Sequence, residues 1–121
     1  MSHPNRALAR TAWSRFLDDV VADRSLASTL VEVETDGLRP RVQERGLLLR
    51  SMSYDPRRDA FEVTVMLPDP HREATLTHVV AGPTAIEVDA PAGVIPQEIR
   101  VSGSDGGRTT IRLDAPTVVS E

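Results

Sequence analysis

The sequence predicts an α+β fold in which one amphipathic helix near the N-terminus packs on a strongly bent, mostly antiparallel sheet. Three observations support this prediction. An apolar stripe with helical spacing covers residues 5–23, the period changes to two from Leu26 onward, and an Asp-Gly turn separates two alternating segments near the C-terminus. No second helix is available for a parallel crossover, so neighbouring strands are expected to run antiparallel. We expect six or seven strands within residues 26–113, in a sheet that bends toward a small open barrel.

The helix is expected over residues 5–23, with Asn5 as its N-cap. Its apolar residues recur three or four positions apart and define a stripe for burial: Trp13, Phe16, Leu17, Val20 and Val21. Arginines come early and aspartates late on the opposite face, an order that opposes the helix dipole. Packing on the sheet, rather than intrinsic propensity, is therefore expected to hold this helix.

Short alternating segments follow the helix and predict the strands. The clearest is 61–67, in which apolar and polar residues alternate until Pro68 ends the pattern. The other candidate strands are 29–34, 47–54, 76–80, 86–88, 99–101 and 109–113. Asp105-Gly106 predicts a hairpin between the last two of them. Residues 116–121 are expected to fray.

Composition sets further limits on the class of protein. A chain of 121 residues suits a single domain, here taken as 1–121. It contains no cysteine, which excludes disulfides, thiolate metal sites and a cysteine nucleophile. No segment reads as a signal peptide or a membrane span, so we expect a cytoplasmic protein that does not bind membranes. The net charge is −4, and this disfavours general nucleic-acid binding because phosphate neutralisation supplies most of that affinity.

No constellation of residues predicts catalysis, a cofactor or a metal ion. The three histidines, His3, His71 and His78, do not have the pairwise spacing of metal ligands. The glycine-rich segment 103–107 lies between two predicted strands and indicates a turn rather than a phosphate loop. His78 shares a strand face with apolar neighbours, which favours a core histidine hydrogen-bonded to a neighbouring backbone group over a general base.

An arginine-rich stretch is the first place to look for a partner. All 14 basic residues of the chain are arginine, and five of them form the predicted interaction surface: Arg39, Arg41, Arg45, Arg57 and Arg58. The last two are expected at the turn between strands 47–54 and 60–67, near the loop that holds the others. Such a surface would suit an acidic partner. The alternative is a solvated loop whose arginines pair with adjacent acids.

Several short motifs also follow one another in a distinctive order. They are Trp13-x-x-Phe16-Leu17-Asp18, Ser53-Tyr54-Asp55, Leu76-Thr-His78-Val-Val80, Pro83-Thr-Ala-Ile86-Glu-Val88-Asp89, Ile99-Arg-Val101 and the Asp105-Gly106 hairpin. Together they resemble a family of small bacterial proteins, from actinobacterial and similar GC-rich lineages, that is classed as a domain of unknown function. The resemblance implies a one-domain protein with its helix before its sheet. It implies no catalytic residue.

The sequence therefore favours a small non-enzymatic module that binds another protein or self-associates, because several sheet edges are available for pairing. The alternative is a small-molecule binding protein, for an anion for example, or a minor enzyme with a site between helix and sheet. Tyr54, Asp55 and His78 are the polar residues expected in such a site, with an arginine to hold the anion. The sequence identifies no cofactor and no specific ligand.

Overall fold

A computed structural model describes residues 6–24, 28–34, 41–42, 47–66, 74–91 and 94–113 of the chain. They form one α-helix, a 3₁₀ turn and nine strands, which confirms the α+β class. The elements are β1 (Arg6–Ala7), the 3₁₀ turn (Arg10–Ala12), α1 (Trp13–Arg24), β2 (Ser28–Glu34), β3 (Arg41–Val42), β4 (Leu47–Asp55), β5 (Ala60–Met66), β6 (Thr75–Ala81), β7 (Pro83–Val88), β8 (Glu98–Gly103) and β9 (Arg108–Leu113). Apart from the two-residue β1 and β3, these are the six or seven strands expected.

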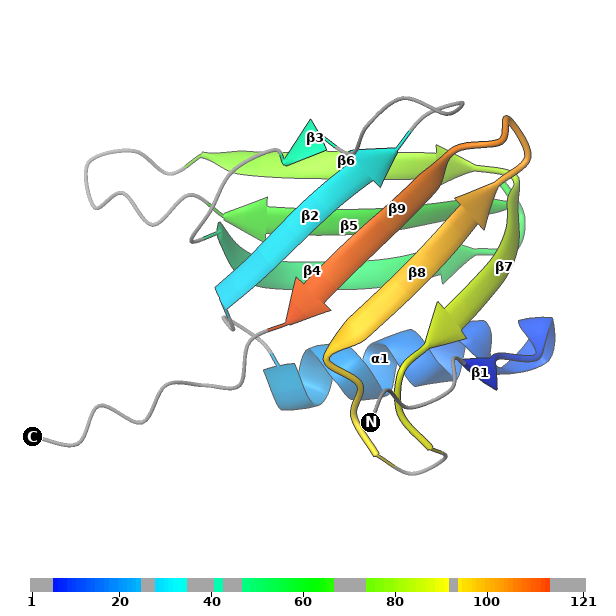
Figure 1. Ribbon diagram of the computed structural model, residues 1–121, viewed down its shortest axis with the longest axis horizontal. Coiled ribbons are helices and arrows are strands. Elements are labelled where there is room, and N and C mark those ends of the chain that lie inside the picture. Colours follow the sequence, from blue (N-terminus) through cyan, green and yellow to red (C-terminus); the bar gives the residue numbers. More distant parts are fainter. Residues whose placement is uncertain are drawn as a thin grey trace, which may run out of the picture.

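All strand pairs are antiparallel, in the order β1-β7-β8-β9-β2-β4-β5-β6, with β3 paired to β2. The path bends sharply between β2 and β4, which share only the pairs Ser28–Leu48 and Thr29–Leu47. The strands consequently form two layers that face each other, β7-β8-β9-β2 and β4-β5-β6 (Figure 1). In the described part of the chain the two ends of the path do not pair, so the layers do not close into a barrel.

The two layers cross at a steep angle and are joined at two corners (Figure 1). One corner is the short β2–β4 contact. At the other, Gly82 alone separates β6 from β7, and its positive φ of 59° gives the left-handed backbone that this abrupt turn requires. The carbonyl oxygen of Gly82 accepts a hydrogen bond from Ser104 N at 3.0 Å, which ties the corner to the β8–β9 turn.

The helix begins later than predicted. Residues 6–8 are extended because β1 pairs with β7 and Leu8 N donates a hydrogen bond to Ile86 O at 2.8 Å. The helix expected over 5–23 therefore starts at Trp13, and a tertiary strand contact prevails over the local helical pattern in its first part. Asn5, the predicted N-cap, lies outside the described residues, as does the tail 116–121.

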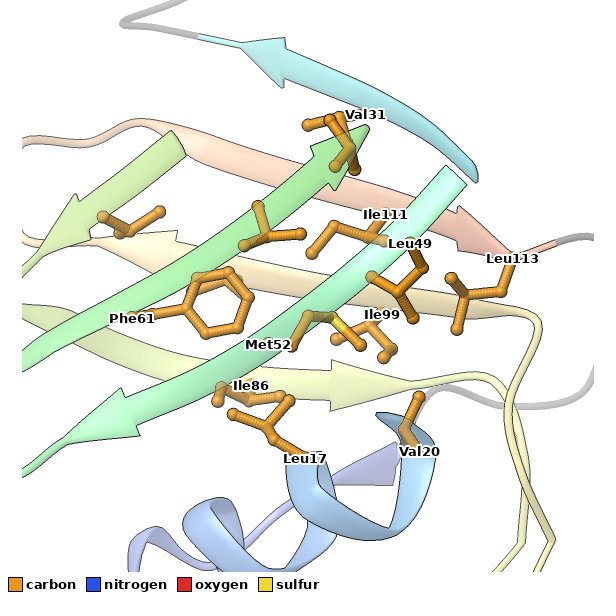
Figure 2. Packing of buried hydrophobic residues seen from close by; sticks show 14 of the residues in the cluster. Leu17, Val20, Val31, Leu49, Met52, Phe61, Ile86, Ile99, Ile111 and Leu113 are labelled. Atoms are coloured by element: carbon orange, nitrogen blue, oxygen red, sulfur yellow. The ribbon is translucent and has the colours of Figure 1, made fainter. Parts of the chain in front are cut away.

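The predicted apolar stripe of the helix is confirmed. Trp13, Leu17 and Val20 are buried, and Phe16 and Val21 pack against the same core. Figure 2 shows Leu17 and Val20 of α1 pointing toward side chains of both layers, Met52 from β4 and Ile86 and Ile99 from β7 and β8. The helix thereby fills a third corner of the molecule, where β4 and β7 diverge (Figure 1).

The predicted hairpin near the C-terminus is also confirmed. β8 and β9 pair from Glu98–Arg112 to Ser102–Arg108. The turn between them contains Asp105-Gly106, and Gly106 has a φ of 86° that favours glycine.

Candidate functional site

Strand β6 is the long edge strand of the sheet. It pairs with β5 along all seven of its residues, and among the described residues no strand pairs with its other edge. None of the seven is charged, although natural edge strands commonly carry charges or proline that discourage pairing. Leu76 is 42% exposed and Val79 is 49% exposed. β6 therefore presents both backbone pairing groups and apolar side chains to the outside.

The opposite end of the strand path is covered differently. The outer edge of β7 is paired with β1 and with the backbone N–H of Leu8, which donates to Ile86 O. Arg6 adds a side-chain hydrogen bond, from Nε to the carbonyl oxygen of Ala90 at 3.1 Å. Residues 6–8 thus protect the β7 edge, whereas the described chain supplies no equivalent cover for β6.

A pocket of about 170 Å³ lies beside β6, between the two layers. Its lining comes from β2, β4, β5 and β6 and consists of Val31, Leu47, Val63, Val65, Leu76, Thr77 and His78. Five of these side chains are aliphatic. The volume is below the roughly 300 Å³ from which small-molecule pockets usually start, and it is of the size that receives an apolar side chain. The pocket lies at the fourth corner of the two layers. This corner contains a cavity, whereas the third corner is filled by α1.

His78 joins the two layers next to this pocket. Its Nε2 atom lies 2.9 Å from Oγ1 of Thr109 on β9, and the Thr109 side chain is buried. Burial lowers the pKa of His78 below its usual value of 6.5, so the ring is neutral at pH 7. His78 is thus hydrogen-bonded, as expected from the sequence, but it is half-buried and its partner is a side-chain hydroxyl on β9 rather than a neighbouring backbone group.

A second polar cluster lies where α1 meets the β4–β5 turn. Arg10 Nη1 donates hydrogen bonds to Tyr54 Oη and to Asp59 Oδ1, both at 3.0 Å. Tyr54 Oη donates to the same Asp59 oxygen at 2.6 Å, and Arg10 Nη2 donates to Pro83 O at 3.0 Å. The Arg10 guanidinium also lies 4.5 Å from the ring centre of Trp13. These side chains are bonded to one another, so the cluster connects the start of the helix to two turns.

The hydrogen bonds of this cluster shift the pKa values of Asp59 and Tyr54 in opposite directions. The bond from Tyr54, together with Arg10, holds the pKa of Asp59 below its usual value of 3.8. The bond to Asp59 raises the pKa of Tyr54 above 10.0. At neutral pH the cluster is therefore a carboxylate held by a neutral phenol and a guanidinium. Asp59 has a φ of 49°, an uncommon conformation for a residue other than glycine.

The predicted polar residues are placed at two locations. Tyr54 and Asp55 end β4, and Asp55 Oδ1 accepts a hydrogen bond from Arg57 N at 2.9 Å in the following turn. His78 lies on β6 beside the pocket. Within the described residues no hydrogen bond joins His78 to Tyr54 or Asp55, and the prediction of a shared site stays a prediction.

The predicted arginine surface falls partly outside the described residues, which include neither Arg39 nor Arg45. Arg57 and Arg58 lie in the turn after β4, as expected, and the Arg58 side chain is 79% exposed. Arg41 is in β3, which pairs with Glu32 and Val33 of β2, beyond the β2–β4 contact and on the side where β4 begins. The backbone of Arg41 and the turn of Arg57 and Arg58 consequently lie toward opposite ends of β4. Docking of an acidic partner on these arginines stays a prediction.

Two features of the site were not predicted from sequence. The apolar pocket forms from four strands, and no single segment carries a signal for it. The Arg10–Asp59 contact joins residues 49 positions apart, and nothing in the intervening sequence indicates it. The β6 edge did have a signal, because Thr75–Ala81 is an uncharged run of seven residues with high strand propensity.

Among the described residues, no helix has both the length and the hydrophobicity of a membrane span. The same residues contain no group of three or more histidine, aspartate or glutamate side chains arranged to hold a metal ion.

Comparisons with known proteins identify a family and nothing more specific. The model of a family described as a family of unknown function (DUF5335) matches residues 4–121. This match spans all the motifs on which the resemblance drawn from the sequence rests. No curated protein and no solved structure matches the chain.

Proposed function

Because the chain belongs to this family of unknown function, we propose its function from the site itself: it is a cytoplasmic, non-enzymatic interaction module that binds an extended apolar segment along β6. The observation that supports the proposal is that an uncharged edge strand lies next to an apolar pocket. Proteins that bind peptides by strand addition use these two elements, with main-chain hydrogen bonds for affinity and side-chain pockets for specificity.

The edge supplies the backbone part of this recognition. An incoming strand would extend the layer β4-β5-β6 by one member and satisfy the outer N–H and C=O groups of β6. Leu76 and Val79 lie on opposite faces of β6, since they are three residues apart in a strand. Both would lose exposed apolar surface when a strand is added, and burial of such surface favours association.

The pocket supplies the selective part. Its aliphatic walls favour an apolar side chain of the bound segment, and a charged side chain would lose hydration there without a partner. The neutral ring of His78 and the hydroxyl of Thr77 are the polar groups of the lining, and the ring is already bonded to Thr109. The segment is therefore expected to be extended, uncharged and rich in branched aliphatic residues.

The alternative of an anion site between helix and sheet is less well supported. Trp13, Leu17 and Val20 fill the contact between α1 and the sheet. Arg10, which lies at the start of this contact, donates to Tyr54, Asp59 and Pro83. An anion would have to displace the carboxylate of Asp59 from its hydrogen bonds with Arg10 and Tyr54.

The proposed function is tested by titrating the ¹⁵N-labelled full chain with short synthetic peptides. The panel contains uncharged peptides rich in valine and isoleucine, and matched peptides in which the central aliphatic residue is aspartate. We expect chemical-shift changes at β6 and the pocket residues for the first group, and weaker binding for the second. Leu76→Asp should abolish the response. Val94→Asp, at an exposed apolar residue in the β7–β8 connection, should leave it intact. Absence of any β6 response across the panel, or the same response in both variants, would contradict the proposal.

A further inference from the structure

We propose that the segment bound along β6 is β6 of a second copy of this chain, so that the protein forms a two-fold symmetric dimer; this rests on the proposed function. Two antiparallel β6 strands would join two three-stranded layers into one continuous sheet, β4-β5-β6-β6-β5-β4. Such an interface is isologous, because the same edge acts as donor and acceptor on both copies.

β6 itself has the composition expected of the segment that binds to it. The strand reads Thr-Leu-Thr-His-Val-Val-Ala, with no charge, no glycine and no proline. These are residues that favour pairing in a sheet, and the exposed Leu76 and Val79 would be buried in both copies at once.

The length of the strand selects a register. His78 is the middle of the seven residues, so the arrangement with His78 opposite His78 of the second copy pairs every residue of both strands. Leu76 then lies opposite Val80, and Thr77 lies opposite Val79. Each of these cross-strand pairs joins residues of one face, as directly opposed residues in an antiparallel pair do. Any shift along the strand leaves residues at both ends without partners.

Charge also favours a second copy at this edge in particular. The chain carries a net charge of −4, so two copies repel each other wherever acidic surfaces meet. Two β6 strands would bring no charged residues opposite each other, because β6 contains none. The one charged residue of β5 is Glu62, which pairs with Val79. Across three strand spacings of about 4.8 Å, and with an offset of two residues along the strands, the two Glu62 residues of the dimer would be at least roughly 14 Å apart. This exceeds the Debye length of about 8 Å at physiological ionic strength, so their repulsion is largely screened.

The experiment is sedimentation velocity of the full chain from micromolar to millimolar concentration. We expect a monomer–dimer equilibrium that saturates at the dimer. Val79→Asp should raise the dissociation constant by about tenfold or more, equivalent to about 1.4 kcal/mol. Val79→Thr, which keeps a β-branched residue, serves as a folding control and should retain most of the dimer. Val94→Asp should dimerise like the unmodified chain.

Cysteine pairing tests the register independently, because the chain has no cysteine of its own. Thr77→Cys and Val79→Cys, mixed and oxidised, should form a disulfide between the two variants, since directly opposite residues lie at Cα distances that a disulfide can span. Each variant alone should form much less. A dimer with these two properties supports the proposal.

Three results would overturn it. One is a monomer at all concentrations, which leaves the proposed function intact if peptides still bind at β6. Another is a dimer that Val79→Asp does not weaken and that gives no disulfide between the mixed variants. The third is open-ended growth instead of saturation at the dimer. If the chain stays monomeric and no peptide binds at β6 either, the proposed function itself fails.

Discussion

His78 Nε2 on β6 and Thr109 Oγ1 on β9 lie 2.9 Å apart and link the two layers of the sheet next to the apolar pocket. Because Thr109 is buried, removal of the imidazole would take a hydrogen-bond partner away from a buried hydroxyl. This contact therefore holds the edge strand β6 in place over the pocket.

Removal of the His78 hydrogen bond should destabilise the protein modestly. Thr109→Val keeps the shape of the side chain and deletes the hydroxyl, so we expect a loss of about 0.5–1.5 kcal/mol in the free energy of unfolding. Denaturant unfolding of a dilute sample measures it. Thr110→Val, on the neighbouring and more exposed position of β9, is the control and should change stability less. Equal losses in both variants would contradict a specific role of the Thr109 hydroxyl.

The stability of the chain should depend on pH through His78. Its folded pKa is below 6.5, so the unfolded chain binds the proton first as the pH falls. The contribution is fully present above pH 6.5 and is lost as the pH falls through the folded pKa. The side chains that line the pocket with His78 and its partner Thr109 are uncharged, so no carboxylate there compensates the protonated ring. The difference in unfolding free energy between the native chain and His78→Gln should shrink over this interval, and a constant difference would exclude the effect.

Tyr54→Phe should raise the pKa of Asp59 toward 3.8, because the phenol is the main hydrogen-bond donor that keeps it low. Because the pKa of Asp59 is lower in the folded chain than in the unfolded chain, its contribution to the free energy of unfolding is present above pH 3.8 and is lost as the pH falls through the lowered folded pKa. Tyr54→Phe should therefore reduce it. Carboxyl ¹³C titration of Asp59 measures the shift directly. Ser53→Ala, one position earlier and exposed, should leave the Asp59 titration unchanged.

The helix should depend on its buried stripe. Leu17 is fully buried between the layers, so Leu17→Ala should cost about 2–5 kcal/mol in unfolding free energy. Asp18→Ala, the next residue and exposed, should stay within about 0.5 kcal/mol of the native chain. Denaturant unfolding compares the two. Similar values would mean that α1 does not close the corner as described.

The corner at Gly82 should be more sensitive than the hairpin at Gly106. Both have positive φ, so alanine at either is expected to cost about 1 kcal/mol in backbone strain. A Cβ at Gly82 would in addition lie 2.7 Å from Ser104 Oγ, whereas at Gly106 it would meet nothing within 4 Å. Gly82→Ala should therefore have the lower unfolding free energy of the two, and adding Ser104→Ala should recover part of the difference. No recovery would place the cost in the backbone alone.

Local patterns were sufficient to predict most of the elements. The period of two located the strands, and Asp105-Gly106 located the hairpin, because these signals depend on neighbouring residues only. The start of the helix was wrong because the pairing of residues 6–8 with β7 is a contact between distant segments. The alternation of apolar and polar residues also did not indicate on which face of β4 Tyr54 lies. The ladder between β4 and β5 shifts between Leu49 and Ser51, so that Leu49 and Met52, three residues apart, are both buried.

The site was less predictable than the fold for the same reason. Its pocket needs Val31 from β2 and Leu76 from β6 to face each other, which depends on how the two layers cross. The cluster of Arg10, Tyr54 and Asp59 likewise depends on where α1 docks. The sequence of β6 shows an uncharged strand, but the strand order is needed to show that this strand lies at an edge.

Amide hydrogen exchange of β6 as a function of protein concentration tests the central claim most directly. In the monomer, the amides of β6 that point away from β5 have no partner strand among the described residues and should exchange quickly. We expect protection within Thr75–Ala81 to rise with concentration, in step with the dimer fraction from sedimentation, while protection in α1 and in the β8–β9 hairpin stays constant. Protection of β6 that does not change while a dimer forms, or a rise confined to other strands, would contradict the claim that β6 is the binding edge.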